Sequence, residues 1–205
     1  MATKGEATKE KILEIARSLI LKKGFSGTSL DEIIAESNIT KGGFFYHFDN
    51  KNDLAKHLML KHQLEDEALF NDMFARANEL SEDPLQQMLI FLKLLAEMME
   101  NMPEVHPGCL VATFISANYQ LSDEVKQVTA ECTISWRVLF AAHLNKILDQ
   151  YTLNIDTSID ELSDMLSAII EGGIILSRTF AEQKILAQQI LQYRNHIRLL
   201  FSKTN

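Results

Sequence analysis

The residues from Thr40 to Lys51 gather side chains suited to binding an anion. Thr40 and Lys41 precede two consecutive glycines, and Tyr46, His47 and Lys51 follow closely. Each glycine weakens a helix by roughly 1 kcal/mol relative to alanine, so the pair calls for another explanation. A bare helix start lets another backbone come close and opens its amides to phosphate. The Gly-x4-Gly-Lys-Ser/Thr spacing is absent, which excludes a nucleotide-binding P-loop.

Other residue types that could do chemistry are weaker candidates. His57 and His62 are five residues apart and would not share a helix face as metal ligands do, so no metal site is expected. His106 and Cys109 give only a weak metal hint. Cys109 follows a Pro-Gly pair and is a candidate thiol sensor, although an inert buried cysteine is the commoner case. No nucleophile motif is present, so neither an enzyme nor a cofactor is expected.

Two helices are expected before the glycine pair. Apolar residues from Ile12 to Ile20 recur at i, i+3, i+4, i+7 and i+8, which predicts one apolar helix face, and Gly24 provides a stop. Ser29 and Glu32 have the spacing of a capping box, in which each side chain bonds the other residue's amide. The second helix should run only to about Glu36.

A tight turn and two further helix starts follow. Asn38 is suited to a left-handed turn conformation, and Thr40 is suited to cap a short helix. Asn50 is another N-cap, with Asp53 three residues later, and it opens a long helix. A helix, a tight turn and a short second helix predict a helix-turn-helix over about residues 29–48.

The stretch from Ile12 to Leu54 resembles the DNA-binding domain of the TetR family of bacterial transcriptional regulators. The matching residues are Ala16, Leu19-Ile20, Gly24-Phe25, Thr28, Glu32-Ile33, Ile39-Thr40-Lys41-Gly42, His47-Phe48 and Lys51. The chain departs from the family pattern at three positions: Asn38 replaces the usual glycine, Ile34 an alanine, and Phe45 a tyrosine. Phe45 therefore lacks a hydroxyl that often touches DNA, and Tyr46 is the neighbour that could compensate.

A helix in the major groove needs short side chains where it approaches DNA, and basic or polar ones around them. Lys41 is expected to reach a base edge, whereas Thr28, Tyr46, His47 and Lys51 are expected to contact phosphates. Phe44 and Phe48 are more typical of core packing. The predicted DNA-binding set is Thr28, Thr40, Lys41, Gly42, Gly43, Phe45, Tyr46, His47 and Lys51.

The rest of the chain also has helical patterns. Residues 84–102 are apolar nearly all round, which predicts a buried helix, and helices are expected at about 109–119 and 122–150. In the last two expected helices, apolar residues recur at alternating steps of three and four residues, a spacing typical of nearly aligned packed helices. Packing within one chain would explain these seams, but the resemblance implies a homodimer. The predicted dimer interface is Leu162, Leu166, Ile169, Gly173, Leu176, Leu186, Ile190, Tyr193 and Ile197.

The family resemblance also implies an effector pocket between the middle helices. Met and aromatic side chains repack around differently shaped guests, and a few polar groups can orient a ligand. The candidates are Met88, Phe91, Leu95, Met99, Phe114, Asn118, Trp136, Phe140, His143 and Phe180. Each of these residues, taken singly, is more often plain core.

Composition and charge are consistent with a regulator of this kind. Residues 1–62 carry a net charge of +2 and residues 63–205 a net charge of −10, which together give the −8 of the chain. Two cysteines in 205 residues exclude a disulfide framework. No secretory signal or membrane span is recognised, so a bacterial cytoplasmic protein is expected.

The sequence thus predicts an all-α protein of about nine helices in two domains. Residues 1–50 would form a three-helix DNA-binding domain, and residues 51–205 an effector-binding and dimerisation domain. The predicted function is that of a ligand-responsive regulator, a repressor released from a palindromic DNA operator by a small molecule. The alternative is a helical small-molecule-binding protein with no remaining DNA-binding role.

Overall fold

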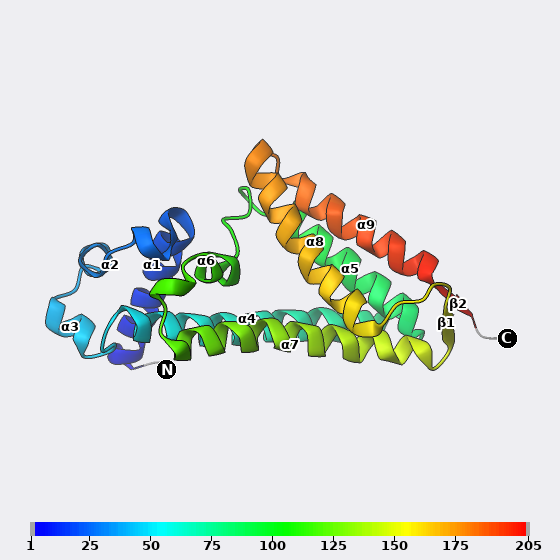
Figure 1. Cartoon of the computed structure of the whole chain (residues 1–205), viewed down its shortest axis with the longest axis horizontal. Coiled ribbons are helices and arrows are strands. Elements are labelled where there is room, and N and C mark those ends of the chain that lie inside the picture. The colour runs from blue at the N-terminus through cyan, green and yellow to red at the C-terminus, as the bar shows by residue number, and fades with distance from the viewer. Residues whose placement is uncertain (1–2, 204–205) are drawn as a thin grey trace. The chain divides into compact units, whose positions relative to one another are not determined.

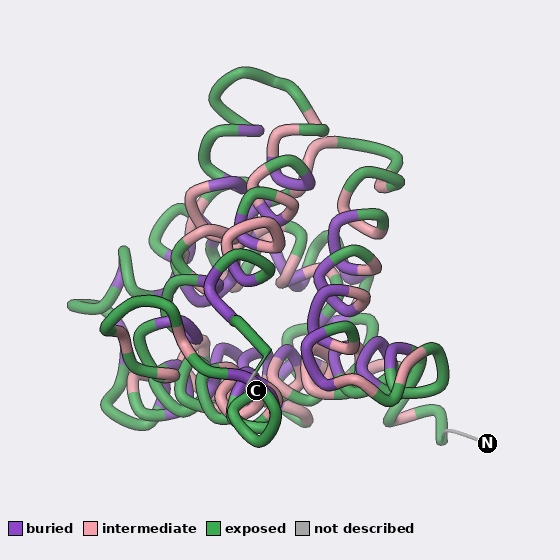
Figure 2. Tube along the Cα trace, turned by 90° about the vertical axis from the view of Figure 1, so that its right-hand side faces the viewer, coloured by how far each residue is buried: buried purple, intermediate pink, exposed green. Residues whose placement is uncertain are grey.

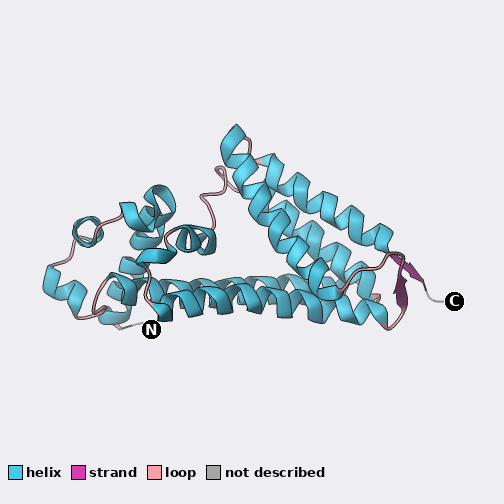
Figure 3. Cartoon of the chain, in the orientation of Figure 1, coloured by secondary structure: helices cyan, strands magenta, loops and turns pink. Residues whose placement is uncertain are grey.

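The computed structural model describes residues 3–203 and is almost entirely helical (Figure 1, Figure 3). Within these residues the helices are α1 (Lys4–Gly27), α2 (Leu30–Ser37), α3 (Lys41–Phe45), α4 (Lys51–Leu80), α5 (Pro84–Glu100), α6 (Leu110–Ser116), α7 (Asp123–Leu148), α8 (Ile159–Phe180) and α9 (Lys184–Leu200). A 3-10 turn, Asn118–Gln120, and two short strands, β1 (Tyr151–Leu153) and β2 (Phe201–Lys203), complete them. The predicted all-α class and helix number are confirmed. No described helix is long and apolar enough to span a membrane.

Some helix ends of the first segment follow the sequence signals, and others depart from them. The Ser29 hydroxyl accepts a hydrogen bond from the amide of Glu32, and Asn38 adopts the left-handed conformation with φ 52°. The predicted capping box at this site is incomplete, because the Glu32 carboxylate pairs with Lys23 instead. Gly24 does not end α1 but kinks it, with φ 78°, a conformation open to glycine at little cost.

The chain packs as two compact units. The first unit contains the described residues up to 64 together with 108–133. Its centre is built from α1, which packs against both α2 and α6. The ring of Phe25, near the end of α1, meets Phe114 of α6 edge-on at 5.4 Å between centroids, and both rings are buried. The first unit therefore joins the helix-turn-helix and its flanking helical segments to residues 108–133, which follow much later in the sequence.

The second unit contains residues 65–107 and the described residues from 134 onward. Here α9 packs against both α5 and α8, and the three helices lie side by side in Figure 1. The Tyr193 hydroxyl of α9 donates to the Leu162 carbonyl of α8 at 2.7 Å, and Arg194 Nε donates to the Leu89 carbonyl of α5 at 2.8 Å. Buried positions recur along each helix, as the purple segments of Figure 2 show. As predicted, α5 is largely buried.

Most of the seam residues predicted to face a second chain are already buried by packing within this one. Six of them are 2% exposed or less, namely Leu162, Leu166, Leu186, Ile190, Tyr193 and Ile197. Gly173 is also buried, and a Cβ placed there would lie 2.8 Å from Leu186 Cδ1. Ile169 is half-buried, and Leu176 is 39% exposed. The same periodicity that favours pairing between chains thus serves the α8–α9 contact, because helices packed within one chain need the same stripe.

Candidate nucleic-acid interface

Helix α3 is fixed at its start by a cap and on one face by a buried aromatic ring. The Thr40 hydroxyl accepts from the amide of Gly43 at 3.0 Å. The Phe44 ring is fully buried and lies 5.5 Å from the ring of Phe48, which is 1% exposed. Both residues are core, as predicted. The backbone of this five-residue helix is therefore held in place, and its other face is left at the surface.

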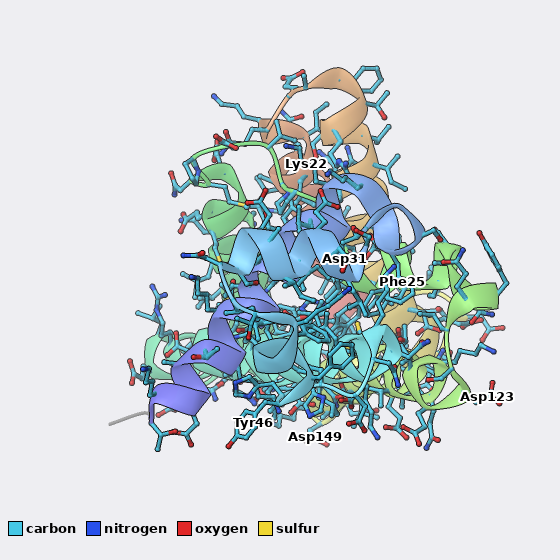
Figure 4. All side chains as sticks on the ribbon, turned by 90° about the vertical axis from the view of Figure 1, so that its left-hand side faces the viewer. Lys22, Phe25, Asp31, Tyr46, Asp123 and Asp149 are labelled. Atoms are coloured by element: carbon cyan, nitrogen blue, oxygen red, sulfur yellow. The ribbon has the colours of Figure 1, made fainter. Side chains whose placement is uncertain are left out.

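That exposed face combines a cation, a residue without a side chain and two aromatic rings. Lys41 and Gly42 are exposed, Phe45 is 50% exposed and Tyr46 is 82% exposed. Figure 4 looks onto the side of α2 and α3 and labels Tyr46. This group, Lys41, Gly42, Phe45 and Tyr46, is called the α3 face below. It offers ring surfaces, a positive charge and open backbone to a partner.

The amino group of Lys41 has a partner that the sequence reasoning missed. Its Nζ lies 3.0 Å from a carboxylate oxygen of Asp31 on α2, and both side chains are exposed. Figure 4 labels Asp31 as well. Exposed ion pairs contribute about 1 kcal/mol at most, so a stronger anion can displace the carboxylate. No spacing rule within one helix could have found this pair, because the two residues lie on different helices.

His47 is half-buried just after the end of α3. Its ring meets the Tyr46 ring edge-on at 4.9 Å, and its amide donates to the Phe44 carbonyl at 2.9 Å. Gly43 is also half-buried, and a Cβ there would point toward Thr40 Oγ1 at 3.4 Å and Ile39 Cβ at 3.8 Å. The missing side chain of Gly43 thus eases packing within the chain. At Gly42 a Cβ would meet nothing nearer than Thr40 Oγ1 at 3.9 Å, so internal packing does not require glycine there.

Lys51 and Thr28 are placed differently from the phosphate contacts predicted for them. The Lys51 ammonium donates to the carbonyl of Phe25 and lies 4.1 Å from the centroid of the same ring. Burial lowers the pKa of Lys51. Thr28 is 1% exposed, and its hydroxyl donates to the Gly24 carbonyl at 2.9 Å. This geometry favours a positioning role for both side chains: Lys51 ties the kinked end of α1 to the start of α4, and Thr28 closes the end of α1 through its bond to Gly24.

The predicted effector residues are only partly brought together. Phe91 and Phe140 are buried in the second unit, where they join Phe70, Phe74 and His143 in one aromatic cluster. Phe74 stacks on Phe91 at 3.9 Å and on His143 at 3.4 Å between centroids. The sequence reasoning missed Phe70 and Phe74, although they are four residues apart on one helix face. This cluster, Phe70, Phe74, Phe91, Phe140 and His143, is called the aromatic cluster below.

His143 has a distinct protonation behaviour in this cluster. Burial, with a smaller contribution from the charge of Lys146, lowers its pKa to about 4. The imidazole is therefore neutral at pH 7, and it offers one hydrogen-bond donor and one acceptor. A neutral ring is also the form that stacks on Phe74 without bringing a charge into an apolar environment.

The other predicted effector residues have varied environments. Met88 and Leu95 are buried in α5, and Met99 and Trp136 are half-buried. Phe114 belongs to the first unit and is used against Phe25, while Asn118 lies exposed in the 3-10 turn. Phe180 is 65% exposed at the end of α8. Phe114, Asn118 and Phe180 therefore do not join the aromatic cluster.

Cys109 takes a structural position at the start of α6. Its Sγ accepts from the amide of Ala112 at 3.5 Å, and its carbonyl accepts from the Thr113 hydroxyl at 2.8 Å. The side chain is half-buried. It is thus the N-cap of a short helix as well as the candidate thiol sensor.

A capped, exposed short helix that follows a second helix across a left-handed turn defines a helix-turn-helix DNA-binding unit. Comparison with known proteins agrees with this class. Residues 12–58 match the family described as bacterial regulatory proteins, tetR family. Over these residues the chain matches the TetR family of transcriptional regulators, a family of non-enzymatic proteins.

Similarity to individual regulators extends over most of the chain. The chain is 26% identical to the uncharacterised HTH-type transcriptional regulator YxaF of Bacillus subtilis over 194 residues, which cover 93% of this chain and 96% of YxaF. It is 27% identical to the transcriptional regulator LmrA of the same organism, with 84% and 87% covered. It is 22% identical to the transcriptional repressor DhaR of a Mycobacterium species, with 82% and 80% covered.

Solved structures share the fold at low sequence identity. A TetR transcriptional regulator from Chloroflexus aurantiacus superposes with a TM-score of 0.78 at 19% identity, covering 98% of this chain and 99% of that one. A TetR-family regulator from Agrobacterium tumefaciens gives a TM-score of 0.77 at 19% identity, with 97% and 100% covered. The two-part helical fold is therefore that of the family.

Proposed function

We propose that this regulator is a repressor that binds a palindromic DNA operator as a homodimer and is released by a small-molecule effector. The observation that carries the DNA-binding part is the α3 face, where Lys41, Gly42, Phe45 and Tyr46 lie exposed while Phe44 fixes the helix from below. The assignment as a repressor is supported by the similarity to DhaR, which is a repressor. In this proposal residues 1–50 bind DNA, and residues 51–205 dimerise and bind the effector.

DNA binding is tested by selecting duplexes from a random pool with the wild-type protein and measuring affinity at several salt concentrations. A protein that binds phosphates displaces cations from DNA, and added salt opposes this release, so its affinity falls as the salt concentration rises. Lys41→Ala should change the base preference at one position of the selected site. Lys93→Ala is the matched control, since Lys93 is an exposed lysine paired with Glu97 at 3.5 Å on α5. A protein that selects no sequence would instead be the small-molecule-binding alternative.

The homodimer is proposed to use the part of α8 that stays uncovered. Met165, Leu176 and Phe180 are 37%, 39% and 65% exposed, and Ile169 and Gly172 between them are half-buried. Their spacing of four, three, four and four places them along one side of the helix. Such an apolar stripe favours contact with a second copy around a twofold axis. Sedimentation of Leu176→Glu as a monomer, against a wild-type dimer, is the expected result, and a wild-type monomer at micromolar concentration contradicts the proposal.

The effector is proposed to be apolar or aromatic and to bind at or beside the aromatic cluster. Its rings can stack on a flat guest, and the neutral His143 can orient one polar atom. An effector of this kind should quench Trp136 fluorescence and release DNA over the same concentration range. A ligand that quenches Trp136 yet leaves DNA affinity unchanged would separate the pocket from the switch.

Cys109 is proposed as a second input only for electrophilic effectors. Its side chain is half-buried rather than fully buried, and the thiolate is the reactive form of a cysteine. Cys109→Ser should abolish release from DNA by an electrophile and leave release by a non-reactive ligand unchanged. Equal responses of Cys109→Ser and wild type to an electrophile would leave Cys109 with its capping role alone.

A further inference from the structure

Phe45 is an apolar side chain in a setting that offers it little cover. Its ring is 50% exposed, and its contact within the chain is an edge-on approach to the buried Phe44 ring at 5.4 Å. A phenylalanine half in water at the surface of a DNA-binding helix loses the free energy that its burial would give. Unlike a tyrosine, it has no hydroxyl with which to hold a phosphate. The ring is therefore suited to an apolar contact with DNA.

The neighbours of Phe45 place that contact among the bases. Lys41 and Phe45 are four residues apart, so their side chains are adjacent on one side of α3. Gly42 on the same face carries no side chain that would hold the helix away from the groove. Both the cation and the ring can then reach into the groove, at base pairs close to one another.

Among the four base pairs, only those with thymine present an apolar group in the major groove, the C5-methyl. We propose that Phe45 reads this methyl group of a thymine close to the base contacted by Lys41. The assignment rests on the proposed DNA-binding function and adds to it a specificity-determining residue and the chemical group that it recognises.

The expected effect follows from the size of the group. Losing the burial of one methyl weakens binding by about fourfold, and losing one in each half of a palindrome by about fifteenfold. Thymidine and deoxyuridine differ only by this methyl group and have the same hydrogen-bonding groups. Replacing one with the other therefore isolates the apolar contact from any hydrogen bond or phosphate contact.

The experiment uses the duplex selected from the random pool by the wild-type protein. Each thymine of the half-site is replaced in turn by deoxyuridine, and affinity is measured by fluorescence anisotropy for wild type, Phe45→Ala and Phe45→Leu. Wild type should lose about fourfold per half-site at one position, Phe45→Ala should show no difference between the two bases there, and Phe45→Leu should retain part of it. Tyr46→Ala is the matched control and should keep the wild-type sensitivity. Thermal unfolding checks that the Phe45 variants remain folded despite the contact with Phe44.

The outcomes separate this inference from the function beneath it. A selected site bound in a salt-dependent manner, with no position sensitive to the loss of a thymine methyl, overturns the role of Phe45 and leaves DNA binding intact. A sensitive position that remains sensitive in both Phe45→Ala and Phe45→Leu also overturns it. If the selection enriches no sequence, the proposed function fails and the role of Phe45 fails with it.

Discussion

Adding one methyl group at Gly42 should raise the stability of the folded protein while weakening its binding to DNA. Gly42 lies in the first turn of α3, and a Cβ there would meet only Thr40 Oγ1 at the ordinary contact distance of 3.9 Å. Replacing a helical glycine with alanine stabilises a fold by up to about 1 kcal/mol. In Gly42→Ala, the stability and the affinity should therefore move in opposite directions.

The size of the affinity loss depends on how closely DNA approaches the helix. Forcing a methyl into a close-packed contact costs about 1–3 kcal/mol, or roughly 5-fold to 150-fold in affinity for each recognition helix. Gly43→Ala is a control within the same turn, because its methyl would face Thr40 and Ile39 of the same chain at 3.4 and 3.8 Å. It should reduce DNA affinity much less.

Urea denaturation measures the first effect, and anisotropy titration with the selected duplex measures the second. If Gly42→Ala binds as tightly as wild type, the start of α3 does not approach DNA closely and the docking geometry is refuted. If Gly42→Ala and Gly43→Ala lose affinity equally, the direction of the added methyl does not matter, and a general disturbance of α3 explains both.

Three further predictions concern packing, protonation and positioning. Gly173→Ala should lower the free energy of unfolding by about 1–3 kcal/mol, because its Cβ would lie 2.8 Å from α9, whereas Gly172→Ala, with nothing within 4 Å, should be neutral or stabilising; similar urea midpoints would contradict this. The pKa of His143 is lowered to about 4 in the folded protein, so between about pH 6.5 and 4 the unfolded chain binds a proton that the folded chain does not. The free energy of unfolding should therefore fall by roughly 2 kcal/mol as the pH is lowered through that range, a value reduced because the ring is partly open to water. His143→Phe should lack this part of the acid destabilisation, and parallel stability curves would refute it. Lys51→Met should lower the free energy of unfolding by about 1–3 kcal/mol through the lost charged hydrogen bond, and the slope of log affinity for DNA against log salt should stay unchanged. A slope reduced by about one would instead indicate that Lys51 contacts a phosphate.

Local signals in the sequence located the helix-turn-helix and its surface. Ser29, Thr40 and Asn50 cap helices by accepting from amides two or three positions further on, and Asn38 ends α2 by its own left-handed conformation, so their roles are largely independent of the rest of the fold. The burial of Phe44 was likewise predicted, because large apolar side chains are more often buried in the core than exposed at the surface. The family could be recognised for the same reason, since its motif lies within one continuous segment.

Contacts between distant residues could not be predicted in this way. The amino group of Lys51 binds a carbonyl 26 positions earlier, Phe114 meets Phe25 from another part of the chain, and Lys41 pairs with Asp31 of another helix. An apolar stripe on a helix fixes which side is covered but does not identify the helix that covers it. The sequence by itself thus determined the helices, several of their ends and the short helix α3 with its exposed face. Only the tertiary structure decided that the α8–α9 seam is closed within one chain and that Lys51 positions α1, because both depend on which surfaces meet when the chain folds.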